Sequence, residues 1–156
     1  MHRHEFKVFA DYHQFYIQDD DVAYGNLSDA WTAEAVEMRM AVASHVVGVG
    51  TVRNIGVPVT VEVFDREPTI DYTEWDQVNL ASIEVSTGRI VVAGCTDYFP
   101  EAARIELPPG TYLVLVCYSG MISADDGGLV GADRYLVALY GGPLQEPQVL
   151  KAAKNG

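Results

Sequence analysis

Short runs of alternating apolar and polar residues dominate this chain and predict β-strands. Valine occupies every second position between Val57 and Val63, so one face of that segment is apolar. The preceding residues, 46–52, are also mostly apolar, and the connector 53–56 holds two residues that tolerate a positive φ. The pattern therefore predicts a β-hairpin that turns at residues 53–56.

The same reasoning predicts strands along most of the chain. They fall at residues 6–10, 12–17, 78–85, 89–95, 104–107, 111–119 and 134–140. Ser86, Thr87 and Gly88 separate two of these strands and predict a second hairpin. Residues 111–119 are continuously apolar or aromatic, which is typical of a central strand buried on both faces.

Residues 26–43 hold the one segment with helical spacing, in which Ala33, Val36 and Met40 share a face and Thr32 is suited to cap the N-terminus. One short helix among about eight or nine strands predicts a mostly β fold, a two-sheet antiparallel β-sandwich. A chain of 156 residues is expected to form a single domain, residues 1–156, with a loose tail from about residue 144.

Charge narrows the choice of partners. The chain has 22 acidic and 10 basic residues, a formal net charge of -12. Nucleic acids and anionic membranes bind clustered Lys and Arg, so the charge disfavours both as direct ligands and favours a basic protein or a cation. The same excess of acidic residues is also expected of a protein whose surface charge serves only its solubility. No apolar signal segment or membrane span is present, which predicts a cytoplasmic location.

Motifs for catalysis are missing from the sequence. It contains no Gly-x-Ser-x-Gly, no phosphate-binding loop and no His-Glu-x-x-His, so we expect neither an enzyme nor a cofactor. A hydrolase that uses a pair of carboxylates is the weakest alternative. Cys95 and Cys117 lack metal-ligand spacing and are expected to be buried, reduced thiols. The Gly- and Asp-rich loop 125–133 has the oxygen ligands of a calcium site but not the regular spacing.

Two groups of carboxylates lie beside aromatic residues and are candidate contact surfaces for a basic protein. The first consists of Asp19, Asp20 and Asp21 with Tyr12 and Trp31. The second consists of Asp71, Glu74 and Asp76 with Trp75. In both, carboxylates would take the places of nucleic-acid phosphates and the rings would anchor the partner. Solvated turns and inward-packed rings are the alternative interpretation of both groups.

Two segments taken together resemble a known family. They are Tyr12-His13-Gln14-Phe15, and Trp31-Thr32-Ala33-Glu34-Ala35-Val36-Glu37 followed by a β run that ends in Thr51-Val52-Arg53-Asn54. This order resembles the competence protein J (ComJ) family, small acidic inhibitors of the cell's own DNA-uptake nuclease. The resemblance covers roughly the first 65 residues and implies a non-enzymatic binder of a nuclease.

Two function classes follow from these observations. The first is a nuclease inhibitor or immunity-like protein that mimics the charge of DNA. The alternative is a β-sandwich that binds calcium or a carbohydrate through the loop 125–133 and exposed rings. The sequence leaves open whether an exposed β edge also forms a homodimer.

Overall fold

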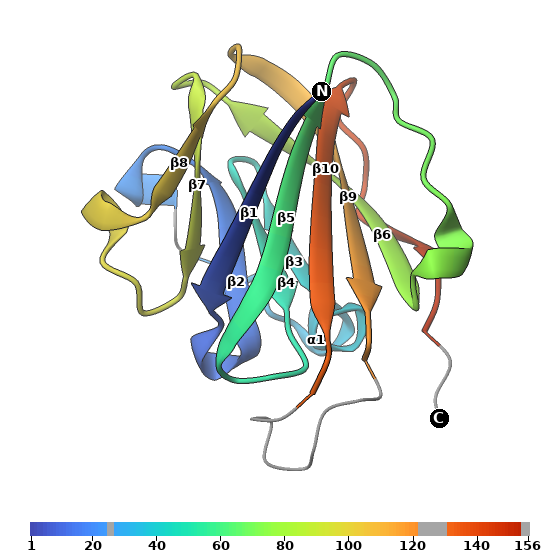
Figure 1. Ribbon diagram of the computed structural model, residues 1–156. Helices are drawn as coiled ribbons and strands as arrows, with labels where there is room; N and C mark the ends of the chain where they lie inside the picture. The colour runs from blue at the N-terminus through green and yellow to red at the C-terminus, as the bar shows by residue number, and fades with distance from the viewer. Residues whose placement is uncertain (25–26, 122–130, 154–156) are drawn as a thin grey trace.

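The computed structural model describes residues 1–24, 27–121 and 131–153, and this part of the chain forms two packed sheets (Figure 1). The first sheet has the order β1 (His2–Phe9), β5 (Gly56–Phe64), β10 (Arg134–Gly141), β9 (Gly110–Ser119), β6 (Gln77–Val85) and β11 (Gln148–Lys151). The second has the order β3 (Met40–Ala43), β4 (Val46–Gly50), β2 (Gln14–Asp19), β7 (Arg89–Gly94) and β8 (Ala103–Glu106). The mostly β, two-sheet fold is confirmed, with eleven strands in the described residues and one parallel pair, β5 with β10.

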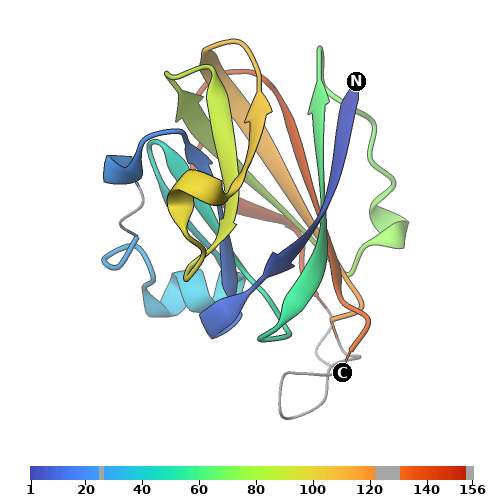
Figure 2. The same ribbon diagram turned by 60° about the vertical axis from the view of Figure 1, so that its left-hand side comes forward.

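The helical segments are short and lie between the strands. The α-helix is α1 (Ala33–Met38), and the 3-10 turns are η1 (Asp11–His13), η2 (Val22–Tyr24), η3 (Tyr72–Glu74) and η4 (Phe99–Glu101). Figure 2 shows η1 and α1 near one end of the sandwich. None of the helices in the described ranges is long and apolar enough to cross a membrane.

Strand β9 is the centre of the core, as its continuous apolar run predicts. Val114 and Val116 pack into the main cluster between the sheets, whereas Leu115 and Cys117 pack into a second cluster on the outer face of the first sheet. Trp75, from the segment that joins β5 to β6, belongs to that second cluster. The first sheet is therefore apolar on both faces, because the connecting segment covers the outer one.

Both predicted hairpins are wrong. β4 pairs with β2 and β3 in the second sheet, whereas β5 pairs with β1 and β10 in the first. β6 and β7 are likewise divided between the sheets. Each strand buries its apolar face against the opposite sheet, so alternation predicts the strand but not its neighbour. The connector after β4 crosses between the sheets and is tied to the first one by a hydrogen bond from Val52 N to the Tyr135 hydroxyl, 2.8 Å.

The helix is shorter than the predicted segment. Thr32 caps it as expected, and its hydroxyl oxygen accepts a hydrogen bond from Ala35 N at 3.2 Å. The helix ends at Arg39, which has a left-handed backbone with φ 61°, and Met40 already belongs to β3. The predicted apolar stripe is wrong, because Ala35 is buried while Val36 is 61% exposed.

The C-terminal segment differs from the expected loose tail. Gln148–Lys151 forms β11 and pairs with β6 at the edge of the first sheet. The Lys151 ammonium donates to the carbonyl oxygens of Tyr72, at 2.8 Å, and Trp75, at 2.6 Å. The tail therefore joins the sheet to the segment around η3.

Candidate functional site

The first predicted acidic group is divided by strand β2. Tyr12 lies in η1, before the strand, and Asp19 is its last residue. Six extended residues span about 20 Å, so the two ends of β2 lie at opposite ends of the second sheet. Trp31 lies at the Tyr12 end, where both residues line one hollow. The structure therefore brings Tyr12 and Trp31 together and separates them from Asp19, Asp20 and Asp21.

Asp19 is fully buried and acts as an internal acceptor. Its carboxylate accepts hydrogen bonds from the backbone and hydroxyl groups of Ser86, at 2.8 and 2.7 Å, and of Thr87, at 3.1 and 2.7 Å. His45 Nδ1 lies 3.0 Å from the same carboxylate. Burial opposes ionisation, but the Ser86 and Thr87 hydrogen bonds outweigh it and lower the pKa of Asp19 to about 2. Asp19 therefore holds the end of β2 to the connector between β6 and β7.

The two following carboxylates lie in different surroundings. Asp20 pairs with Arg89 Nε at 2.8 Å and with Arg104 Nε at 3.2 Å. Partial burial raises the pKa of Asp20, but the hydrogen bonds from Arg89 and Arg104 outweigh that effect and lower it. Asp21 is exposed and accepts one hydrogen bond from Ala23 N at 2.9 Å. Of the three aspartates, Asp21 presents the most accessible carboxylate.

The second predicted group has exposed carboxylates and a buried ring. Asp71, Glu74 and Asp76 are all exposed around η3. Trp75 is only 6% exposed, and the Arg134 guanidinium lies over its ring, 4.4 Å from the ring centre. Trp75 therefore fixes the segment to the sheet and does not present a ring to a partner.

Hydrogen bonds hold the carboxylates around η3 in place. Asp71 caps the turn and accepts from Thr73 N at 3.0 Å and from the Thr73 hydroxyl at 2.6 Å; these bonds lower the pKa of Asp71. Asp76 accepts from Met121 N at 3.0 Å. We call residues 65–76 the acidic segment; its exposed carboxylates belong to Asp65, Glu67, Asp71, Glu74 and Asp76. In Figure 1 this segment runs down the side of the first sheet beside β6.

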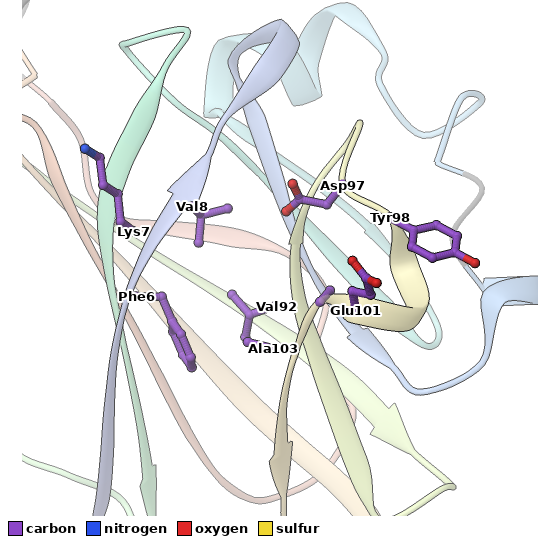
Figure 3. Close-up of a pocket in the computed structure, with 9 residues that line it drawn as sticks. Phe6, Lys7, Val8, Val92, Asp97, Tyr98, Glu101 and Ala103 are labelled. Atoms are coloured by element: carbon purple, nitrogen blue, oxygen red, sulfur yellow. The ribbon is translucent and has the colours of Figure 1, made fainter.

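A further acidic and aromatic group lies at a cleft that the sequence did not single out. The cleft, about 330 Å³, opens between β1 and the β7–β8 edge. Figure 3 shows Phe6 pointing from β1 toward this space, with Asp97, Tyr98 and Glu101 on the opposite side. Tyr98 is 68% exposed. Asp97, Tyr98 and Glu101 lie close together in the sequence, between β7 and β8, and the fold places them opposite Phe6 of β1.

A hollow of about 640 Å³ lies between η1 and α1. We call it the η1–α1 hollow; its lining residues are Tyr12, His13, Gln14, Trp31, Val36, Arg39, Gly50, Thr51 and Val52. Tyr12 is 68% exposed, and Val36 is exposed at the helix surface. Trp31 packs over Gly48, where an added Cβ would lie 3.0 Å from the indole ring. The absence of a side chain at Gly48 thus allows the ring to approach the second sheet closely.

The predicted calcium loop falls largely on residues 122–130, which lie outside the described residues. Asp133 is described, and its buried carboxylate pairs with Arg53 and accepts from the Tyr135 hydroxyl. Within the described ranges, no group of three or more His, Cys, Asp or Glu side chains could hold a metal ion.

Comparison with known proteins identifies structural neighbours only. No protein-family model and no curated protein matches the chain. Among solved structures, ComJ from Bacillus subtilis, described as an inhibitor of the DNA-degrading activity of NucA, is 18% identical with a TM-score of 0.67. That match covers 91% of this chain and 96% of the other. The protein of crocagin biosynthetic gene J is 16% identical with a TM-score of 0.62, over 92% and 100% of the two chains.

These likenesses establish a shared fold. The resemblance to ComJ that residues 12–15 and 31–54 suggest is confirmed at the level of the fold. It extends beyond the first 65 residues, because the structural match covers 91% of the chain. At these identities the comparison says nothing about which side chains the proteins use.

Proposed function

We propose that this chain is a non-enzymatic protein that binds and inhibits a basic nuclease. One observation carries the proposal: a fold like that of the nuclease inhibitor ComJ presents five exposed carboxylates along one twelve-residue segment. The formal net charge of -12 supports the same partner class, because it attracts a cationic surface and repels nucleic acid. Both cysteines are free thiols, which fits a cytoplasmic protein; Cys117 is buried as expected, whereas Cys95 is exposed, contrary to the prediction.

The acidic segment is our candidate for the contact face. Asp71, Glu74 and Asp76 would occupy the positions that DNA phosphates take on the nuclease, with Tyr72, 36% exposed, between them. Trp75 beneath them would hold the carboxylates in one arrangement. A preorganised surface loses less conformational entropy on binding than a mobile loop does.

The proposal gives different roles to the residues of the first acidic group. Asp21 is exposed and would add to the long-range attraction of the partner. Asp19 and Asp20 are engaged within the protein and would act by holding the end of β2 to the β6–β7 connector and to strands β7 and β8. Tyr12 and Trp31 lie in the η1–α1 hollow and are not part of the acidic segment.

Inhibition of a basic DNase tests the proposal. DNase activity captured from native lysate on the immobilised protein at low salt would be purified and titrated with the soluble protein. We expect activity to fall at a one-to-one ratio and the association rate to decrease as salt rises. DNase activity that stays unchanged at every ratio of protein to enzyme, or an association rate that does not depend on salt, would contradict the proposal.

A pair of variants with equal charge change locates the contact. The test variant carries Asp71→Asn, Glu74→Gln and Asp76→Asn; the control carries Asp97→Asn, Glu101→Gln and Glu106→Gln, three exposed acids near β8. We expect inhibition to weaken by about tenfold or more in the test variant and by much less in the control. Equal weakening would indicate that net charge alone matters and would refute the acidic segment as the contact face.

A further inference from the structure

The non-glycine residues with a positive φ lie together at the η1–α1 hollow. Three non-glycine residues in the described ranges have a positive φ: Tyr12 at 58°, His13 at 60° and Arg39 at 61°. All three line this one hollow, although they come from two separate elements. The left-handed conformation is unfavourable for residues with a Cβ, and such residues gather at ligand-binding and catalytic sites. The hollow therefore has the backbone signature of a functional site.

Arg39 is held firmly by its backbone. Its N–H donates to the carbonyls of Ala35 and Val36 at the end of α1. Its carbonyl oxygen accepts from Gly50 N at 2.8 Å and from the buried Tyr118 hydroxyl at 2.6 Å. These contacts fix the Cα and so restrict where the side chain can reach.

The Arg39 side chain lines the η1–α1 hollow and also a second hollow, which Glu34 and Glu37 line. The residue is half-buried, yet the described residues provide it with no ion pair within 4 Å. Arg53, Arg89 and Arg104 each pair with an aspartate. Like Arg66 and Arg134, Arg39 has no ion pair among the described residues, and it supplies a local positive charge at the hollow.

The polar groups of the hollow offer mainly donors. The Gln14 carbonyl oxygen accepts from the Tyr16 hydroxyl, so its amide NH₂ remains to donate. His13 Nδ1 lies 3.1 Å from the Val52 carbonyl oxygen and donates its proton to that oxygen, so this nitrogen is already engaged within the protein. Together with Arg39, the Gln14 amide suits a ligand rich in acceptors, above all a carboxylate.

We propose that the η1–α1 hollow binds a small molecule that joins a carboxylate to an aromatic or apolar ring. The carboxylate accepts from Arg39 and Gln14, and the ring packs against Tyr12 and Trp31. A volume of about 640 Å³ is ordinary for a small-molecule site. The site goes beyond the proposed inhibition of a nuclease, since it uses none of the carboxylates of the acidic segment.

Three probes separate the two halves of the ligand: N-acetyl-tryptophan, its amide, which lacks the carboxylate, and acetate, which lacks the ring. Each is titrated into the full-length, isotope-labelled protein and followed by amide chemical shifts and calorimetry. We expect the acid to saturate a site that includes Tyr12, Trp31 and Arg39, and to bind at least about tenfold more tightly than either fragment. Equal affinity for the acid and its amide, or no saturation by about 10 mM acid, overturns the proposal.

Two arginine variants form the matched comparison. Arg39→Gln removes the charge from the hollow, and Arg66→Gln removes the same charge from an exposed position in the acidic segment. We expect acid binding to weaken about tenfold or more in the first and to stay unchanged in the second. Tyr12→Ala tests the ring contact at a residue whose exposure makes misfolding a small risk. Weakening by Arg66→Gln as large as that by Arg39→Gln contradicts the assignment.

The nuclease assay is run on the same variants to keep the two proposals apart. Arg39→Gln and Tyr12→Ala leave the acidic segment intact, so we expect both to inhibit the DNase like the unaltered protein. Ligand binding without any DNase inhibition would refute the proposed function alone. Inhibition without ligand binding would refute this inference alone.

Discussion

Replacing Asp19 by Asn removes a charge that the fold has fully surrounded. The carboxylate receives four hydrogen bonds from Ser86 and Thr87, two from backbone N–H groups and two from hydroxyls. An asparagine offers one acceptor oxygen, and its NH₂ must face donors on the other side. Buried donors then lose their partners. We therefore expect Asp19→Asn to lower the free energy of unfolding, although the side chain keeps its size.

The magnitude follows from the pKa. A pKa of about 2 in the folded protein, against an ordinary value of 3.8, corresponds to about 2.4 kcal/mol of stability from the ionised form. Because the folded pKa is the lower one, this stability is present in full well above pH 4 and is lost as the pH falls through about 2. Unpaired donors add to the cost in the variant, which gives a loss of about 3 kcal/mol at pH 7.

Urea unfolding gives the free energy of unfolding of Asp19→Asn and of the control variant Asp21→Asn. The control changes a neighbouring aspartate that differs mainly in its exposure. We expect Asp21→Asn to change stability by less than about 0.5 kcal/mol, since its carboxylate is exposed. Both series are repeated between pH 5 and pH 2, over about the range of the shifted pKa. The free energy of unfolding should fall more steeply in Asp21→Asn, which keeps the Asp19 carboxylate, than in Asp19→Asn. A loss below about 1 kcal/mol at pH 7, or parallel acid profiles, would refute this account of Asp19.

Three further predictions test other parts of the fold. Gly94→Ala would place a Cβ 1.9 Å from the Phe9 carbonyl oxygen and should cost about 3 kcal/mol or more, whereas Gly141→Ala meets nothing within 4 Å and should be nearly neutral in the same unfolding assay. Arg39→Gly relieves the left-handed backbone and should raise stability by about 1 kcal/mol while it abolishes acid binding; unchanged stability would contradict the strain. Burial raises the pKa of Cys117 to about 12, so Ellman's reagent at pH 8 should titrate one thiol in the native protein and two in guanidinium.

Local chemistry predicted several elements of this fold correctly. The continuous apolar run became β9, and Thr32 caps the helix through its hydroxyl. The cap depends on an interaction between residues close in the sequence, and the strand depends on burial that its apolar run indicates. Strand pairing depends instead on contacts across the chain. The connectors 53–56 and 86–88 contain turn residues, but these turns pass the chain from one sheet to the other.

The three consecutive aspartates show why composition predicts a site only in part. Asp19 is the last residue of β2 and its side chain is buried, whereas Asp20 follows the strand and reaches arginines on β7 and β8. Asp21 lies beyond the strand and faces solvent. One acidic run therefore supplies an internal acceptor, an ion pair and an exposed charge, and only the position of the strand end distinguishes them.

The η1–α1 hollow could not be predicted as a site, because φ is not visible in residue types. Glycine is the residue that adopts a left-handed backbone at least cost, yet Tyr12, His13 and Arg39 occupy these positions. Each of these three residues therefore occupies a position at which glycine would make the folded backbone more stable. Tyr12 is 68% exposed, and Arg39, which is half-buried, has no ion pair in the described structure, so no salt bridge offsets that cost for either residue. The proposed ligand, by contacting both side chains, would supply the physical reason for their presence, and the rise in stability expected for Arg39→Gly would measure what the site costs the fold.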